Sequence, residues 1–192
     1  NGGELNLYSS IVFNNKASSG GGIYAYGDSS TNKNAIMNIY NSIIQNNECF
    51  SGQEGGGGIC MDNAVATIYN TTIDNNQASD WGGGMSIIDY SDVTMKNTII
   101  SNNDGGNNGG GLAIAGDSTV TLRQSSFINN DANNGDDIYT YYSPNISLIN
   151  TYFNNPNNNN NIYEFQGTPT WKTCSDNLCT EFPFTGNCTA VD

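Results

Sequence analysis

The sequence predicts an all-β solenoid, in which short parallel strands stack coil upon coil around one apolar interior. Three observations lead to this fold class. A unit of about 26 residues recurs along most of the 192-residue chain. Apolar and polar residues alternate within each unit with period two, as they do in strands. No unit shows a helical period, because glycines and asparagine pairs stand where a helix would break.

The first strand of each unit is expected just after a run of glycines. The apolar residue that ends the run recurs at spacings of 36, 26, 27, 26 and 24 residues, with insertions near 29–34 and 49–53. It stands at Ile23, Ile59, Met85, Leu112, Ile138 and Ile162. Asp136 and Asp137 replace the glycines before Ile138. The glycines allow positive φ angles or close packing of coils. A phosphate-binding glycine loop would need a following helix and a nearby lysine, which these segments lack.

A second strand is expected around another apolar residue that recurs once per unit. These residues are Leu7, Ile39, Ile68, Met95, Leu122 and Leu148, and a further apolar residue follows each of them by five positions. A hydroxyl residue follows each by three positions, at Ser10, Ser42, Thr71, Thr98, Ser125 and Thr151. Each unit therefore predicts three short strands and three bends, which stack into three parallel sheets.

An asparagine stands seven positions after the second apolar residue in every unit. The column is Asn14, Asn46, Asn75, Asn102, Asn129 and Asn155. Asparagine tolerates the left-handed conformation of bends, and amides stacked at the strand spacing of about 4.8 Å can bond to one another. We interpret this column as a structural asparagine ladder. Compositional bias would explain the run at 155–161, but not one position filled in every unit.

The two recurring motifs resemble those of a known group of proteins. The first stands as GGGIY, GGGIC, GGGMS and GGGLA, and the second as an apolar residue followed three positions later by asparagine, in the segments 12–15, 44–47, 73–76, 100–103 and 127–130. Together they resemble the repeats of polymorphic outer membrane proteins and, more broadly, right-handed parallel β-helix proteins. The resemblance covers about residues 3–165. It implies a secreted or surface-displayed protein of adhesive or structural function.

The chain divides into a predicted parallel β-helix of about six coils at 1–167 and a C-terminal segment at 168–192. The first coil starts just before Leu5 and lacks its glycine-led strand, which would leave strand edges for self-association or a neighbouring chain. The C-terminal segment departs from the repeat and gathers cysteine with Trp171. It is expected to be a disulfide-bearing cap, or a docking tail that contacts the next subunit.

Cysteines and sequons favour an extracellular or cell-surface location. Because the chain has no histidine, its cysteines favour disulfides over zinc binding. The disulfide candidates are Cys49, Cys60, Cys174, Cys179 and Cys188, and possible N-glycosylation sites are Asn70, Asn145 and Asn187. The net charge of −13 disfavours nucleic acid as a partner. The sequence contains no run of about 18 apolar residues, so membrane insertion is not expected.

The outward positions of the glycine-led sheet contain no recognisable catalytic set. Asp62 is the one acid expected on that face, without the second carboxylate or the basic residue that sugar cleavage or elimination would need. No cofactor is predicted. The acids after the first strands are expected to cap turns, although a weak Ca²⁺ site among them stays open. They are Asp28, Asp62, Asp89 and Asp117.

Tyrosines form the best candidates for ligand or partner contact. Tyr8, Tyr40 and Tyr69 are expected on the middle sheet, and Tyr24, Tyr26, Tyr139, Tyr141 and Tyr163 on the glycine-led sheet. Exposed aromatic rows can hold sugar rings or a protein partner, or can simply stabilise the sheet. An ice-binding face would need two rows of small residues. The row at Thr67, Thr94, Thr121 and Ser147 instead lies beside Tyr69, Lys96 and Arg123.

From these features we expect a non-enzymatic extracellular structural or adhesive solenoid, assembled end to end into a filament or surface layer. The alternative is a carbohydrate-binding or carbohydrate-active β-helix that uses the outward tyrosines.

Overall fold

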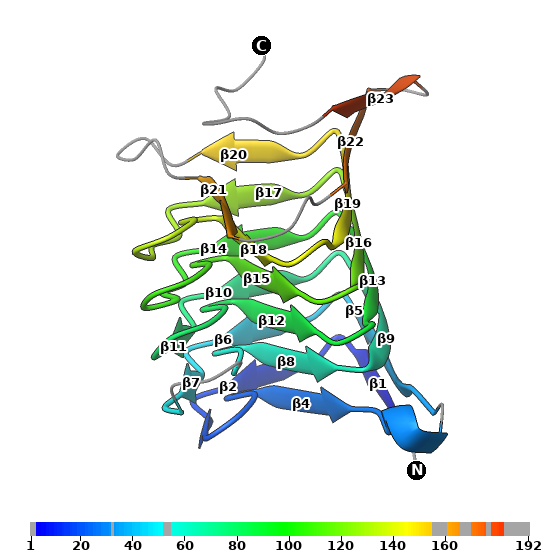
Figure 1. Ribbon diagram of the computed structural model, residues 1–192. Coiled ribbons are helices and arrows are strands. Elements are labelled where there is room, and N and C mark those ends of the chain that lie inside the picture. The colour runs from blue at the N-terminus through cyan, green and yellow to red at the C-terminus, as the bar shows by residue number, and fades with distance from the viewer. Residues whose placement is uncertain are drawn as a thin grey trace.

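The chain forms a solenoid of about five turns, whose short strands stack along one axis (Figure 1). The computed structural model describes residues 3–31, 33–51, 55–154, 161–165, 170–175 and 178–182, the last two ranges as backbone. Within these residues every strand pairs in parallel with its neighbours, except for one antiparallel pair at the C-terminal end. The predicted all-β parallel solenoid is confirmed.

Sheet A is built from the second strand of each coil, and sheet D from the glycine-led strand. Sheet A contains β1 (Glu4–Tyr8), β5 (Ala35–Tyr40), β9 (Ala64–Tyr69), β13 (Asp92–Lys96), β16 (Thr119–Arg123), β19 (Asn145–Ile149), β22 (Thr170–Ser175) and β23 (Leu178–Phe182). Sheet D contains β4 (Ile23–Tyr26), β8 (Ile59–Asp62), β12 (Met85–Ile88), β15 (Leu112–Ala115), β18 (Ile138–Tyr141) and β21 (Ile162–Phe165).

Two further sheets complete each turn. Sheet B contains β2 (Ile11–Phe13), β6 (Ile43–Gln45), β10 (Thr72–Asp74), β14 (Ile99–Ser101), β17 (Ser126–Ile128) and β20 (Tyr152–Asn154). Sheet C is a short addition to the three predicted sheets, with β3 (Lys16–Ala17), β7 (Glu48–Cys49) and β11 (Gln77–Ala78). The described part of the chain also contains the 3-10 turn η1 (Ser29–Thr31), and it has no helix with the length and apolar character to cross a bilayer.

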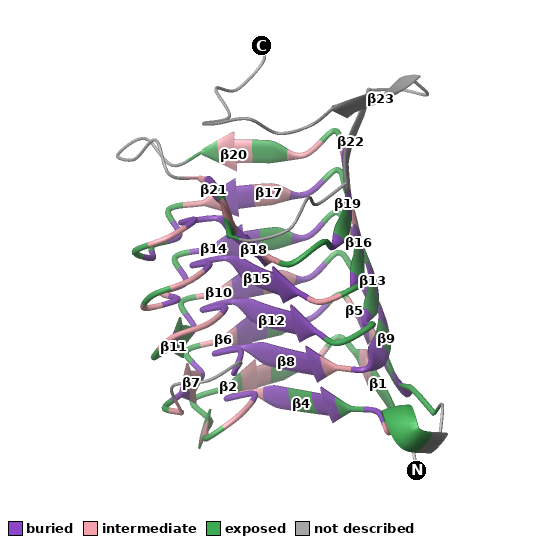
Figure 2. Cartoon of the chain, in the orientation of Figure 1, coloured by how far each residue is buried: buried purple, intermediate pink, exposed green. Residues whose placement is uncertain are grey.

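The strands pair in the register that the repeat predicts, so equivalent side chains stack along the axis. The second apolar residue of each unit meets its counterpart across sheet A, as Leu7 meets Ile39 and Met95 meets Leu122. The alternating pattern turns these residues into the interior, and Figure 2 shows strands of the middle coils, such as β12 and β15, in the colour of buried residues. One continuous cluster of isoleucine, methionine, leucine and valine fills that interior, with Phe127 stacked on Phe153 at 4.9 Å between ring centroids.

Sheet A continues past residue 167, where the predicted solenoid ends. β22 pairs in parallel with β19, and β23 turns back to pair antiparallel with β22. Cys174 and Cys179 are register partners in that antiparallel pair, but their side chains lie outside the described residues, as do Asn155, Asn187 and Cys188. The disulfide-bearing cap therefore stays a prediction.

Two columns of left-handed residues make the bends on either side of sheet B. The first column has φ angles of 48° to 52° at Ser9, Asn41, Asn70, Asn97, Gln124 and Asn150. The second has φ angles of 51° to 56° at Asn14, Asn46, Asn75, Asn102 and Asn129. A left-handed residue costs about 1–2 kcal/mol for most side chains and least for glycine and asparagine, which explains the choice of asparagine at these bends.

Hydroxyl side chains close the first bend from inside. Each hydroxyl donates a hydrogen bond to the carbonyl two residues earlier, for example from Ser42 to Tyr40 at 2.8 Å. Its oxygen also accepts the backbone N–H of the equivalent residue in the preceding coil, as Ser42 does from Ser10 at 3.1 Å. The hydroxyl column that the sequence revealed thus bonds backbone groups that the bend withdraws from the sheets.

Candidate functional site

The second bend carries a buried ladder of asparagine side chains, and a polar groove lies along its outer side. Each amide nitrogen in the ladder donates 3.0 Å to the amide oxygen of the next coil. That same oxygen accepts the backbone N–H of the asparagine below it, at 2.9–3.1 Å. The ladder consists of Asn15, Asn47, Asn76, Asn103 and Asn130, and all but Asn15 are buried.

This ladder lies one residue later than the predicted column. The predicted residues that the structure describes occupy the left-handed bend positions and are exposed. Asn75 bonds to Asn46 there, and Asn102 donates 2.8 Å to Asp74. The sequence shows two adjacent asparagines, and the bend decides which of them points inward. Because the left-handed residue turns the chain, its side chain faces solvent and its successor faces the interior.

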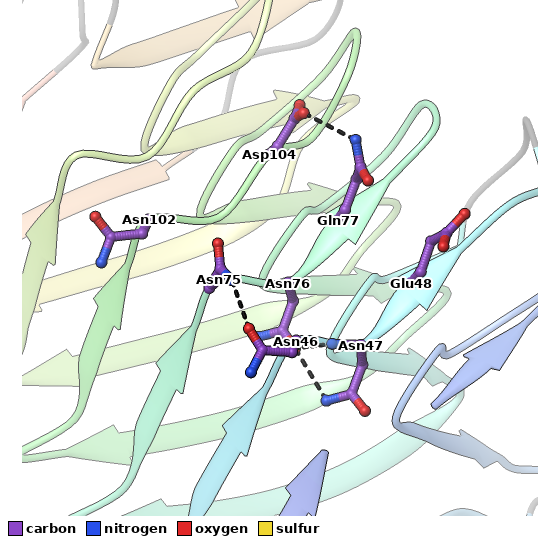
Figure 3. Close-up of a pocket in the computed structure, with 8 residues that line it drawn as sticks. All are labelled: Asn46, Asn47, Glu48, Asn75, Asn76, Gln77, Asn102 and Asp104. Atoms are coloured by element: carbon purple, nitrogen blue, oxygen red, sulfur yellow. Dashed lines mark hydrogen bonds between the residues drawn. The ribbon is translucent and has the colours of Figure 1, made fainter. Parts of the chain in front are cut away.

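A polar groove of about 360 Å³, here called the amide groove, runs along the outside of this bend (Figure 3). One wall carries the left-handed asparagines, and the other carries the outward residues of sheet C and the segment after β14. Its lining is Asn46, Asn47, Glu48, Asn75, Asn76, Gln77, Asn102 and Asp104. Gln77 donates 3.2 Å to Asp104, and Glu48 pairs with Lys16 at the N-terminal end of the same outward column. Amides and carboxylates together offer both donors and acceptors to a hydroxyl-rich ligand.

Asp137 terminates the ladder. In the next coil the sequence has Pro156 where the ladder asparagine would follow, and Asp137 where earlier coils have glycine. The Asp137 carboxylate takes over as acceptor, since the Asn130 amide donates 2.9 Å to its Oδ1. Its Oδ2 is buried without a hydrogen-bond partner. Burial raises the pKa of Asp137 to about 7; the Asn130 hydrogen bond lowers it and the adjacent Asp136 raises it further.

The tyrosines of sheet A form a stack whose rings cover one another. Tyr8 and Tyr40 lie 5.3 Å apart and only 6° from parallel, while Tyr69 lies 6.4 Å further along the column and is tilted by 46°. The Nζ atom of Lys96 lies 5.8 Å from the centre of the Tyr69 ring. Tyr40 has a ring on each face and presents only its edge and hydroxyl to solvent, whereas Tyr8 at the end of the column is 62% exposed. The stack therefore favours sheet stabilisation over the stacking of sugar rings.

A tryptophan that the sequence analysis did not single out packs against two of the sheet D tyrosines. Trp81 meets Tyr139 and Tyr141 edge to face, at 5.3 and 5.8 Å between ring centres, two coils beyond its own. Tyr139 is consequently 5% exposed, and burial raises its pKa to about 12. The intervening strand β15 carries only alanines at its outward positions, which leaves room for the indole. In the sequence, this row of small residues together with a tryptophan in a nearby loop was the signal from which the contact could have been predicted.

The remaining predicted contact tyrosines lie toward the two ends of sheet D. Tyr24 and Tyr26 are 50% and 56% exposed at the N-terminal end of sheet D, and Tyr163 is stacked on Tyr139 at 5.8 Å. Between these two ends, Cys60 and Ser86 are buried at outward positions of the sheet. The predicted row is thus two separate groups rather than one open surface.

The turn acids occupy separate bends. Asp28 accepts hydrogen bonds from the backbone N–H and hydroxyl of Ser30, so it caps η1 as expected. Asp89 is itself left-handed, with a φ of 46°. The described residues contain no cluster of three or more histidine, cysteine or acidic side chains arranged to hold a metal ion. The weak Ca²⁺ site among Asp28, Asp62, Asp89 and Asp117 stays a prediction.

Of the predicted cysteines and sequons, the structure describes four in detail. Cys49 is a buried thiol that donates 3.1 Å to the Ser18 carbonyl, and burial raises its pKa. Cys60 is buried on the outer side of β8. Asn70 is exposed but left-handed, with its amide nitrogen 2.8 Å from the Asn41 oxygen. Asn145 is exposed at the start of β19.

Comparison with known proteins agrees with this architecture. A family model described as "Right handed beta helix region" matches residues 1–152. No curated protein and no solved structure matches the chain. Since the family model covers most of the chain and the solenoid is seen directly, the chain belongs to the right-handed β-helix family.

Proposed function

We propose that this solenoid is a non-enzymatic scaffold at an extracellular or cell-surface site, with a structural or adhesive role. The observation that carries the proposal is the set of ladders. The recurring side chains, namely ladder amides, hydroxyls and bend asparagines, make hydrogen bonds to neighbouring coils. The recurring residues therefore bond neighbouring coils to one another and stiffen the solenoid along its axis.

The surface chemistry fits the same role. The outward rows are rich in hydroxyl, amide and tyrosine groups, and a net charge of −13 keeps such rods apart in solution. The resemblance to polymorphic outer membrane protein repeats belongs to this proposal, as does end-to-end assembly. Both agree with a rod-shaped surface module.

Electron microscopy and force spectroscopy test the scaffold role. The purified chain is expected to give rods of uniform width that resist extension until whole coils detach, and beads coated with it are expected to adhere to cells or matrix. Sedimentation over a range of concentrations would show whether the rods join. Turnover of a polysaccharide panel into cleaved or unsaturated products would contradict the proposal.

A second function, binding of a neutral glycan, is favoured by the amide groove. One wall repeats an asparagine in successive coils, and the other carries a carboxylate or an amide at each step, so a sugar chain lying along the axis would meet two polar groups per coil. Asp104→Ala would remove a wall carboxylate, whereas Asp117→Ala would remove the same charge from a separate turn. Glycan-array binding that Asp104→Ala reduces and Asp117→Ala leaves intact would support this function. Equal binding by both variants would contradict it.

A further inference from the structure

A pair of basic residues stands at the centre of the outer face of sheet A. Lys96 ends β13 and Arg123 ends β16, and the two are direct register partners on adjacent strands. They continue the column of Tyr8, Tyr40 and Tyr69. Arg123 is exposed and Lys96 is half-buried against the Tyr69 ring. Two cations one strand apart are therefore held side by side, at a spacing of about 4.8 Å between backbones.

This pairing is unusual for so acidic a chain. The sequence has 18 acidic and only 5 basic residues, yet Lys96, Arg123 and Lys172, the register partner of Ser147, all lie on sheet A. The ion pair found within the described residues joins Lys16 to Glu48, away from this face. Like charges directly opposite each other on neighbouring strands destabilise a sheet. A chain with many carboxylates to spare has placed none beside this pair.

The register partners of the pair on the two flanking strands are Tyr69 and Ile149, and neutral hydrogen-bonding groups lie before and after the pair along its own strands. Thr94 and Thr121 lie two positions earlier on the same strands and face outward, and Asn97 and Gln124 follow at the left-handed bend. Asn97 also lies 3.5 Å from the Tyr69 hydroxyl. The surroundings thus supply rows of hydroxyls and amides around two unneutralised cations.

We propose that Lys96 and Arg123, with Thr94 and Thr121 beside them, bind an anionic group carried on a sugar chain. The two cations would contact different oxygens of one sulfate or carboxylate, and charge-assisted hydrogen bonds of this kind are the strong ones. The flanking hydroxyls and amides suit the sugar hydroxyls on either side. An acidic protein partner is the competing occupant, and a polyglutamate probe distinguishes it from an anionic sugar chain.

This site is distinct from the amide groove and does not depend on the scaffold role. Rods that bind no anionic glycan would contradict the site and leave the scaffold proposal standing. Anionic-glycan binding together with polysaccharide cleavage would support the site and contradict the non-enzymatic scaffold role.

Calorimetric titration of the whole chain with four probes tests the site. The probes are a sulfated hexasaccharide, a hexauronate, a neutral hexasaccharide and a polyglutamate peptide. Binding of either or both anionic sugars, at least about tenfold tighter than the other two probes and weaker in high salt, is expected. The two anionic arms show whether sulfate or carboxylate is preferred. Binding of polyglutamate as tight as that of the sugars would overturn the proposal.

Charge-matched variants locate the binding. Lys96→Gln and Arg123→Gln are each expected to weaken binding by about tenfold or more. Lys33→Gln removes the same charge from an exposed loop residue and is expected to leave affinity within about twofold. Neither sheet variant should lower the melting temperature, because each relieves a like-charge contact. Equal losses in all three variants would show a general charge effect and overturn the site.

Discussion

At the scale of single residues, the two asparagines of each bend have different functions. The sequence correctly predicted a left-handed asparagine column, because only a few residue types accept positive φ. It could not predict that the buried ladder belongs to the following residue. Two adjacent asparagines look alike in sequence, and only the three-dimensional path of the bend shows that Asn76 faces inward and Asn75 outward.

Substitution of a ladder asparagine should therefore cost far more than substitution of its neighbour. Asn76→Ala removes the acceptor of the buried Asn47 backbone N–H, and it also removes one hydrogen bond each from the Asn47 amide and the Ile44 carbonyl. We expect the free energy of unfolding to fall by at least about 3 kcal/mol, measured by urea denaturation. Asn75→Gly is the control, because glycine accepts a φ of 51°, and it should change stability by less than about 1 kcal/mol. Similar losses in both variants would contradict the assignment.

Asp137 makes a pH-dependent prediction. Its pKa is raised from 3.8 to about 7 in the folded chain, so folding favours the protonated form. Its contribution is fully favourable below pH 4 and is lost as the pH rises through 7. Asp137→Asn keeps an acceptor for Asn130 and removes the charge. The stability of the variant relative to the wild type should grow between pH 4 and 7, by up to about 4 kcal/mol, and then level off.

Denaturant titrations of both proteins from pH 4 to 8 would measure this difference. Carboxylates remote from Asp137 titrate equally in the two chains, so their effects cancel in the comparison, and only the adjacent Asp136 is coupled to the substitution. A stability difference that stays constant over this range would show that Asp137 keeps an ordinary pKa. The sequence contained a hint of this exchange, because aspartate at a glycine position and proline at a ladder position depart from the repeat in the same coil.

At the scale of elements, the glycine runs separate into two physical causes. The sequence left open whether they supply positive φ or close approach. The structure shows both, at successive positions. Gly82 has a φ of 62°, whereas Gly57 has an ordinary φ and lies against the coil above, where an added Cβ would stand 2.4 Å from the Gly83 carbonyl oxygen. The second glycine thus sets how closely coils can stack.

Gly57→Ala should consequently push two coils apart. The clash is with backbone atoms of Gly83 and Gln77, which cannot rotate away, so we expect a loss of about 2 kcal/mol or more in unfolding free energy. Gly3→Ala adds the same methyl group at a position with no heavy atom within 4 Å and should be close to neutral. Thermal and urea unfolding would compare the two. Equal stability would mean that the stack relaxes at this point without penalty.

Side chains that reach across elements were harder to predict than the elements themselves. Alternation and repeat length depend on near neighbours in sequence, so strand positions and register followed from them. The contact of Trp81 with Tyr139 spans 58 positions and two coils, and it depends on the path of a loop outside the repeat. The repeat predicts which equivalent residues stack on one another, but it does not predict a contact between side chains from different positions of the repeat.

At the scale of the whole molecule, stability should vary along the axis because each coil contacts only its neighbours. Strands in the middle pair on both sides and bury their apolar residues completely, as Ile68 of β9 and Ile73 of β10 do. β1 and β2 each pair on one side in the described chain, and Leu7 and Val12 are only partly buried. Local opening should therefore begin at the outer coils and proceed inward.

Hydrogen exchange followed by mass spectrometry tests this order in the 192-residue chain. Amides of β9, β10 and β12 should exchange slowest, and those of β1, β2 and β20 faster. Asn76→Ala should speed exchange most in β6, β10 and β14, the strands joined through its part of the ladder, with a smaller effect on β17. Uniform protection along the axis, and a uniform loss in the variant, would show that the solenoid opens as one cooperative unit. In that case the ladders would couple all coils instead of neighbouring pairs.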